Sequence, residues 1–456
     1  MPRMKPMATA GTDIERYLDR TAAVDRFRAG RRRTAGIFDV LAPEAYHDRP
    51  IPLRNPIVFY EGHLPAFSVN TLLKKGLEEP GIDPRFEVLF ERGIDPEDVA
   101  AVPGSPAGWP PRELIQAYGQ RADRAIVEAF ETKDVTREDR PVLARGLAAY
   151  TILEHEEIHQ ETLLYMWHRL PYEKKRAPAG APRPLLGGQA PARATARIPA
   201  GPAALGAKKE KIPFGWDNEF SEHVVEVPGF EIDVYDVTNR DFLEFVREGG
   251  YDREELWSEE GWRWRVDSDA RHPISWERRG NEWMWRGMFE GVPLPPAWPV
   301  FVSHAEASAY ARWRDSRLMT EPEFHRAAYG TPSGAEHSYP WGDEPPDRSR
   351  GNFDFARWDP VPVGSHPAGA SAWGVHDLLG NGWEWTSTVF APFPGFEPMA
   401  SYPVYSVDFF DGKHWVMKGG SFATAKPLLR RSLRNWFRGN YPYPYATFRT
   451  VRSTES

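Results

Sequence analysis

The sequence contains no cysteine, and this absence excludes several kinds of chemistry at once. Without thiols the chain can form no disulfide, no thiolate metal site and no cysteine nucleophile. It also lacks any run of about 18 apolar residues, which a membrane-spanning helix would need. The first 20 residues have no apolar core typical of a secretion signal. We therefore expect a cytoplasmic protein with no membrane partner.

The sequence also has no excess of basic residues. The chain has 57 Lys and Arg against 65 Asp and Glu, for a net charge of −8. Such a balance gives no electrostatic footprint for nucleic acid. What the sequence does have is length and aromatic content: 456 residues, of which 41% are hydrophobic and 18 are Trp. This length predicts more than one domain, each with a sizeable core.

The first part of the chain shows apolar residues at helical spacing. Four such segments lie at residues 13–42, 53–77, 109–130 and 137–171. Long helices joined by loops are typical of a helical bundle, which we expect over residues 13–172. Residues 1–12 lack this pattern, and we expect them to be disordered.

The composition changes after residue 172. Residues 173–205 are rich in Pro and Ala, which predicts an extended linker with no core of its own. Beyond it, short aromatic strand patterns alternate with Gly and Pro turns. We expect residues 206–456 to form a mixed α+β domain with little regular structure.

Two histidines in the fourth helical segment, His155 and His159, indicate a metal site. Residues four apart on a helix lie about 40° apart on one side, so both rings can bind one ion. Their segment, LEHEEIHQETLLYMW, is apolar enough to be buried, and buried imidazoles need a partner. The stretch HEEIH also fits the H-E-x-x-H pattern of zinc proteases. A pair of histidines without metal is the plainest alternative.

A zinc protease would need a further ligand after this stretch, and the residues that follow do not supply one. Instead, a third ligand can come from another helix, where His63 lies in the apolar stretch FYEGHLPAF. The alternative for His63 is a buried histidine bonded to a backbone carbonyl. Three neutral imidazoles leave coordination positions open, which suits Fe(II) and dioxygen as well as zinc.

Motifs in the second half resemble those of the formylglycine-generating enzymes, whose fold is of the C-type-lectin kind. They are GNGWEW within residues 374–390, KGGSF and a late FR within residues 418–452, together with RLMTEPEFHRAAYG and YPWGDE. We expect Asn381 and Glu384 in these motifs to be scaffold rather than catalysts. The formylglycine enzymes bind copper through cysteines, so their chemistry is excluded here.

The two halves together resemble the non-haem iron sulfoxide synthases of ergothioneine and ovothiol biosynthesis. In that family a DinB-like four-helix bundle with H-x-x-x-H-x-E precedes a formylglycine-generating-enzyme-like domain. The resemblance implies Fe(II) bound by His63, His155 and His159. It also implies that a thiol and dioxygen take the open positions, and that the oxidised sulfur is joined to an imidazole carbon to give a sulfoxide.

The resemblance also implies where the imidazole substrate binds. In the ergothioneine branch this substrate is hercynine, a histidine betaine, and the family's R-N-W segment contacts it through residues that match Asn435 and Trp436. Many of these enzymes have Gln where this chain has Ile158, so recognition of the betaine differs here. The family's catalytic tyrosine does not follow WEW directly. Tyr402, Tyr405, Tyr441, Tyr443 and Tyr445 remain candidates, and the catalytic acid stays unassigned.

Several alternatives stay open at this point. Ovothiol enzymes usually carry an added methyltransferase domain, and none follows the FRTVRS segment here, which favours ergothioneine synthesis. The thiol is cysteine or γ-glutamylcysteine. A synthase that uses histidine, one that uses a selenosugar, an H-E-x-x-H zinc hydrolase and a non-catalytic metal protein are the other hypotheses. The oligomeric state is left open.

Overall fold

Helices build one unit of this chain, and short strands with further helices build the other. The computed structural model describes residues 17–91 and 108–454. The helical unit takes most of the chain up to Glu156 together with the segment Met399–Pro403, and the mixed unit takes Glu157–Pro398 and Val404–Ser456. The boundary between the units falls inside one helix, α6. Residues 1–12, which we expected to be disordered, lie outside the described residues.

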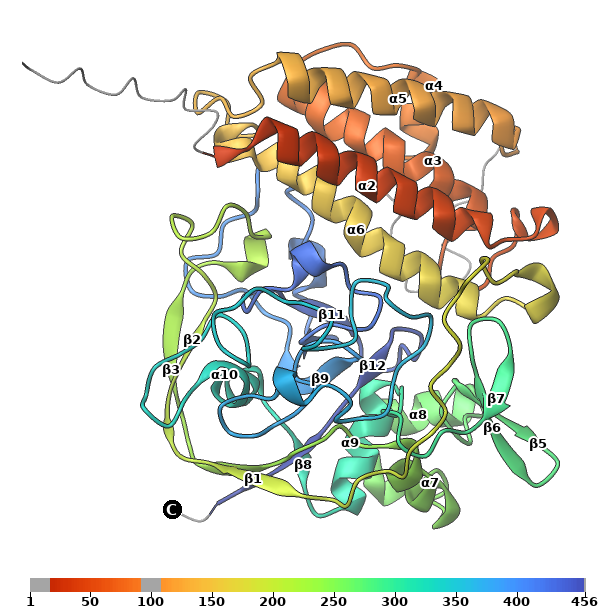
Figure 1. Ribbon diagram of the computed structural model, residues 1–456, viewed down its shortest axis with the longest axis vertical. Helices are drawn as coiled ribbons and strands as arrows, with labels where there is room; N and C mark the ends of the chain where they lie inside the picture. Colours follow the sequence, from red (N-terminus) through yellow and green to blue (C-terminus); the bar gives the residue numbers. More distant parts are fainter. Residues whose placement is uncertain (1–16, 92–107, 455–456) are drawn as a thin grey trace, which may run out of the picture. The chain divides into compact units, whose positions relative to one another are not determined.

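The helical unit is built on helices, most of them long, that lie side by side (Figure 1). They are α2 (Arg20–Asp39), α3 (Ile57–Ser68), α4 (Pro84–Leu89), α5 (Arg112–Thr132) and the first part of α6 (Leu147–His168). A π-helical stretch, Val69–Gly76, continues α3. The core is apolar and draws on several of these helices, with Phe27 from α2, Phe67 from α3, Ile126 from α5 and Ile152 from α6. In the described residues, no helix is long and apolar enough to cross a membrane.

Each predicted segment contains a helix, although α2 spans only Arg20–Asp39 of the predicted 13–42, of which residues 13–16 lie outside the described residues. The short helix α4 was not predicted, and α6 begins later than expected. The sequence pattern predicted a helix from residue 137, whereas α6 begins at Leu147. Arg145 and Gly146 have φ values of 56° and 76°, which belong to the left-handed region and interrupt a right-handed helix. The helix then runs unbroken to His168 and carries both His155 and His159.

The mixed unit contains small sheets with helices between them. Its helices are α7 (Asn239–Arg247), α8 (Glu259–Asp267), α9 (His304–Trp313) and α10 (Glu321–Tyr329). Its strands are β1 (Thr195–Ile198), β2 (Gly201–Leu205), β3 (His223–Val227), β4 (Phe230–Asp233), β5 (Trp276–Arg279), β6 (Glu282–Arg286), β7 (Gly291–Pro293), β8 (Arg317–Leu318), β9 (Trp383–Val389), β10 (His414–Lys418), β11 (Asn435–Arg438), β12 (Ala446–Thr447) and β13 (Thr450–Ser453).

Two four-stranded sheets organise this unit. One has the order β1-β4-β13-β8 with antiparallel neighbours, and the other has the order β11-β10-β9-β12, in which only β12 runs parallel to its neighbour. Helix starts are fixed by capping boxes. Ser303 and Glu306 exchange side-chain and backbone hydrogen bonds at the start of α9, and Thr320 and Glu323 do so at α10. These caps explain how helices of only nine or ten residues form within a loop-rich fold.

The predicted linker was too long at its C-terminal end. Residues 195–205, which we placed in a linker without a core, form strands β1 and β2. Strand β1 pairs with β4, and the side chains of Ile198 and Leu205 are buried. The Pro and Ala content of the segment hid this alternation, because small residues pack well against a sheet only when a partner strand is present.

Asn381 and Glu384 support the fold, as we expected. Glu384 is fully buried and accepts hydrogen bonds from the guanidinium of Arg449 at 2.6 and 2.8 Å. Arg449 also pairs with Asp236 at 3.0 Å. Asn381 has a φ of 66°, and its side chain exchanges hydrogen bonds with the backbone of Val361. The GNGWEW and late FR motifs therefore meet in one buried ion-pair network.

Candidate metal centre

Three histidines lie close enough together to share one metal ion. His63 comes from α3, and His155 and His159 come from successive turns of α6. Each ring offers one nitrogen, and these three nitrogens lie within 4.8 Å of one another. A metal ion bound to imidazoles sits about 2.0 to 2.2 Å from each nitrogen, so the nitrogens of one site lie at most about 4.4 Å apart, and a shift of a few tenths of an ångström brings the three rings within that range. The structure thus brings together the three residues that the sequence analysis selected.

The backbone orients His63. Its Nδ1 lies 3.0 Å from the carbonyl oxygen of Phe90, and this hydrogen bond leaves Nε2 as the nitrogen available for a metal. Burial lowers the pKa of His63 to about 4, so the ring is neutral at physiological pH. The backbone bond that we considered as an alternative role is therefore present, and it is compatible with metal binding through the other nitrogen.

Aromatic side chains surround the histidine rings. Phe67 stacks on His155 with 3.5 Å between ring centroids and an angle of 6° between the planes. Phe59 stacks on His63 at 5.0 Å. His63 and His155 are only 3% and 5% exposed. This packing holds the rings in place and limits the access of water.

Glu156, the acid of the H-E-x-x-H pattern, lies in surroundings that do not suit the general base of a protease. Its carboxylate accepts two hydrogen bonds from Arg31, at 3.0 and 3.1 Å, and another from the hydroxyl of Thr34. Arg31 also pairs with Asp123 at 2.9 Å. Although burial lowers the pKa of Arg31, the two carboxylates hold it above its usual value. A carboxylate bound in this way is poorly placed to activate water.

Glu161, five residues further along α6, has a different environment. Its carboxylate accepts hydrogen bonds from Trp383 Nε1 at 2.8 Å, from Ser421 Oγ at 2.7 Å and from Thr424 Oγ1 at 2.7 Å. In the sequence this glutamate stands out only as part of the H-x-x-x-H-x-E motif, and we predicted no role for it. Its donors lie far along the chain, so no local pattern could identify them.

Asn435 and Trp436 lie on strand β11 in the mixed unit and are half-buried. The ring of Trp436 stacks on Phe390 with 4.1 Å between centroids and an angle of 7°. Tyr405 meets it edge-on at 5.3 Å, and Phe409 lies at 5.5 Å. One face of the indole is therefore already covered by an aromatic ring, and we call these four side chains the Trp436 aromatic group.

Of the five candidate tyrosines, Tyr402 lies beside a predicted metal ligand. Its ring centroid lies 6.5 Å from that of His155 and 5.3 Å from that of Phe67. The segment that carries it, Met399–Pro403, belongs to the helical unit. Tyr405 contacts Trp216 and Trp436, and Tyr441 contacts Phe437. Tyr443 contacts Tyr441, and Tyr445 bonds to His168.

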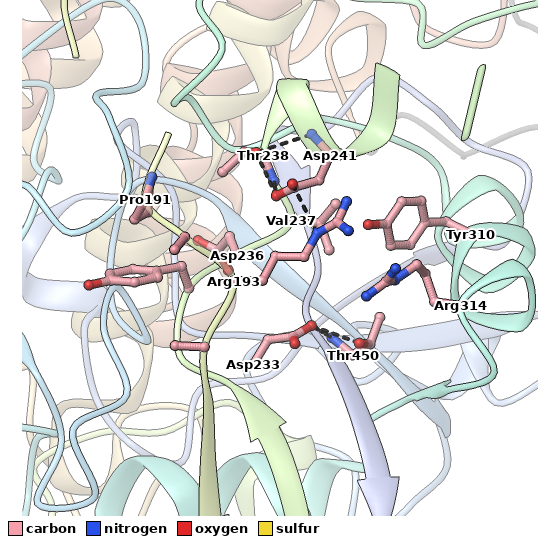
Figure 2. Close-up of a pocket in the computed structure, with 13 residues that line it drawn as sticks. Pro191, Arg193, Asp233, Asp236, Val237, Thr238, Asp241, Tyr310, Arg314 and Thr450 are labelled. Atoms are coloured by element: carbon pink, nitrogen blue, oxygen red, sulfur yellow. Dashed lines mark hydrogen bonds and ion pairs between the residues drawn. The ribbon is translucent and has the colours of Figure 1, made fainter. Parts of the chain in front are cut away.

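The mixed unit also holds cavities that none of these residues lines. One, of about 30 Å³, lies where Arg193, Tyr310 and Arg314 point toward one another near Asp233 and Thr450 (Figure 2). A single water needs roughly 10 to 15 Å³, so this cavity is far too small for an amino acid. Another, of about 320 Å³, is lined in part by His304 and Trp415.

Comparison with known proteins identifies relatives over nearly the whole chain. Residues 184–454 match the sulfatase-modifying factor enzyme 1-like domain. A hercynine oxygenase of Mycolicibacterium smegmatis is 34% identical, over 95% of this chain and 98% of its own length. A hercynine oxygenase of Mycobacterium tuberculosis is 41% identical over 54% of this chain and 57% of its own. Ergothioneine biosynthesis protein 1 of Neurospora crassa is 30% identical over 91% of this chain and 55% of its own length.

Proposed function

Because this chain belongs to the family of the hercynine oxygenases, we propose that it joins the sulfur of a thiol to the imidazole of hercynine in ergothioneine biosynthesis. It is an oxygen-dependent oxidoreductase, and we propose Fe(II) as its metal. The observation that carries the proposal is the cluster of His63, His155 and His159, whose three nitrogens lie within 4.8 Å of one another. We also propose that the helical unit is a DinB-like bundle.

The reaction balances without a further reductant. The imidazole C–H and the thiol S–H each give up a hydrogen, and the new bond joins carbon to sulfur. One oxygen atom of O₂ ends on sulfur as the sulfoxide, and the other leaves as water with the two hydrogens. Four electrons pass from the two substrates to O₂. Cysteine or γ-glutamylcysteine is the proposed thiol.

The donor set fits iron of this kind. Three neutral nitrogens from one side leave other coordination positions open, which is typical of non-haem iron sites that bind a substrate and O₂ together. When bound, Fe(II) supplies the site at which thiolate and O₂ meet and exchange electrons. The protein's own contribution is to hold the three rings in fixed orientations, through the carbonyl of Phe90 and the stacked ring of Phe67.

The Trp436 aromatic group supports recognition of the trimethylammonium group of hercynine. A quaternary cation lies favourably against aromatic faces where water is scarce. Phe390 covers one face of Trp436, so the cation would use the opposite face or the neighbouring rings of Tyr405 and Phe409. Ile158, on α6 beside the metal ligands, argues the other way, because its apolar side chain replaces the Gln with which many of these enzymes hold hercynine.

Tyr402 is the group that we propose as the proton donor. Its ring lies next to His155, and a phenol remains protonated at neutral pH. From this position it can supply a proton to the oxygen atom that leaves as water, and it regains one from the substrates. Without such a donor, oxidation of the thiol alone would compete with C–S bond formation.

The experiment that tests the function is an anaerobic Fe(II) titration followed by O₂ uptake and product mass spectrometry. We expect uptake only when a thiol and hercynine are both present, with a product whose mass equals both substrates plus one oxygen and minus two hydrogens. Competition between hercynine and histidine then fixes the imidazole substrate. Equal use of histidine would move the assignment toward the ovothiol type. Zn²⁺-dependent peptide cleavage without O₂ uptake would overturn the proposal.

A further inference from the structure

The surroundings of Glu161 are built for a carboxylate. Trp383 Nε1 can only donate a hydrogen bond. Ser421 Oγ accepts from the backbone N–H of Ala423 at 3.0 Å, and Thr424 Oγ1 accepts from the backbone N–H of Ser421 at 2.8 Å. Because these N–H groups occupy the hydroxyl oxygens as acceptors, each hydroxyl directs its proton to Glu161. Three groups whose protons can only point toward Glu161 thus donate hydrogen bonds to its carboxylate.

The donors come from the mixed unit's strand β9 and the turn after β10 rather than from α6 itself. Trp383 opens strand β9, and Ser421 and Thr424 follow β10 in the GGSF turn. Gly419 and Gly420 have φ values of 90° and 140°, and a Cβ at Gly419 would lie 2.8 Å from the carbonyl oxygen of Leu378. Glycine is therefore needed there for the turn to approach so closely.

Glu161 lies on the side of α6 that faces away from the metal ligands. At about 100° per residue, it sits roughly 160° around the helix from His159 and 120° from His155. A side chain fixed on one face of a helix sets the rotation of that helix about its axis. The direction in which the two histidines point then depends on the bonds that Glu161 makes on the other face.

We propose that Glu161 is a positioning residue for the metal centre, which fixes the rotation of α6 and so the aim of His159 and His155. The proposal rests on the proposed metal site. Groups that orient metal ligands through the protein typically change metal affinity by about 10- to 100-fold when they are lost. We expect an effect of this size for Glu161→Gln, because the N–H₂ group of the amide would then face a group that itself donates a hydrogen bond.

The test is Fe(II) affinity of the folded protein, measured anaerobically by competition with a chelator, for Glu161→Gln. The Fe(II)–nitric oxide electron paramagnetic resonance spectrum is recorded beside it. We expect weaker affinity by roughly 10- to 100-fold and an altered spectrum. Thr424→Val, which removes one donor from the opposite side of the contact, should change both readouts in the same direction and by less.

A matched control is Thr386→Val. Thr386 is buried in the same sheet and donates to the carbonyl of Val416 at 2.8 Å, with no bond to α6. It should lower the melting temperature and leave Fe(II) affinity and spectrum unchanged. If Glu161→Gln also lowers only the melting temperature, the positioning role is wrong while the proposed function stands. If the unaltered protein binds no Fe(II), the proposed function itself fails.

Discussion

In each half of helix α6 a predicted metal ligand is followed by a buried glutamate, Glu156 or Glu161, and the two glutamates are bound in opposite ways. In the first half, Glu156 follows His155 and is neutralised by the guanidinium of Arg31. In the second half, Glu161 follows His159 and meets only neutral donors. In the part of the chain that the structure describes, no Lys or Arg lies within ion-pair distance of Glu161.

Because Glu156 pairs with a charged group and Glu161 bonds to neutral donors, the two glutamates have different functions. An ion pair between helices stabilises the bundle, and it tolerates small changes in geometry because charge acts over distance. Three short hydrogen bonds to neutral donors are directional, and they fix orientation more than they stabilise. We infer that the first half of α6 secures the helical unit and the second half sets the geometry of the metal centre.

The largest effect should come from removing a ligand in either half. His155→Ala and His159→Ala should each abolish Fe(II) binding, because two imidazoles hold iron far more weakly than three. Anaerobic titration monitored by chelator competition measures this directly. His168→Ala serves as the control, since His168 lies on the same helix but bonds to Tyr445. Retention of tight iron binding by His155→Ala would show that the cluster is not the metal centre.

The next largest effect concerns Tyr402, which approaches the first half of the helix. Tyr402→Phe keeps the ring beside His155 and removes the proton. We expect the sulfoxide yield to fall by roughly tenfold or more, since general acid catalysis contributes about 10²- to 10⁴-fold. The product of thiol oxidation alone should rise. Mass spectrometry of both products checks this, with Tyr441→Phe as the control. An unchanged product ratio would exclude Tyr402 as the acid.

A smaller effect should follow at the Trp436 aromatic group. A cation against an indole contributes about 0.5 to 2 kcal/mol, so Trp436→Ala should weaken hercynine binding by roughly 2- to 30-fold. Histidine, whose ammonium is compact and strongly hydrated, should lose less. Calorimetric titration of both ligands measures the two losses. Equal losses would mean that no trimethylammonium site exists at this residue.

The smallest effect on turnover should come from Glu156→Gln. The substitution breaks the ion pair with Arg31, and a buried polar group left without its partner costs about 1 to 3 kcal/mol of unfolding free energy. Turnover per folded molecule should stay within about twofold, because Glu156 acts on the bundle and not on the substrate. Urea unfolding and a steady-state assay give the two numbers. A loss of turnover by orders of magnitude would revive the protease hypothesis.

The local sequence was sufficient to predict the part of the metal site that lies on a single helix. The i, i+4 spacing of His155 and His159 follows from helix geometry, and the apolar context of His63 marked it as the third partner. Burial and helical pattern made these three residues candidates, and the family resemblance implied that they form one ligand set. That they bind iron stays a prediction.

Contacts between distant segments could not be read in this way. Tyr402 was one of five equal candidates, because its place beside His155 depends on a segment that packs far from its sequence neighbours. The donors to Glu161 were hidden for the same reason. We predicted too long a linker because strands β1 and β2 form by pairing with later strands. Composition does not reveal such pairing.

The segment Met399–Pro403 has a consequence for how the molecule is made. Ser401 Oγ lies 2.8 Å from Thr151 Oγ1, and Tyr402 packs on Phe67. The helical unit is otherwise complete at Glu156, and the 242 residues from 157 to 398 must be synthesised before this segment begins. At about 5 to 20 residues per second, a ribosome needs roughly 12 to 50 seconds for that stretch. A nascent chain therefore presents its three histidines long before it gains the tyrosine beside them.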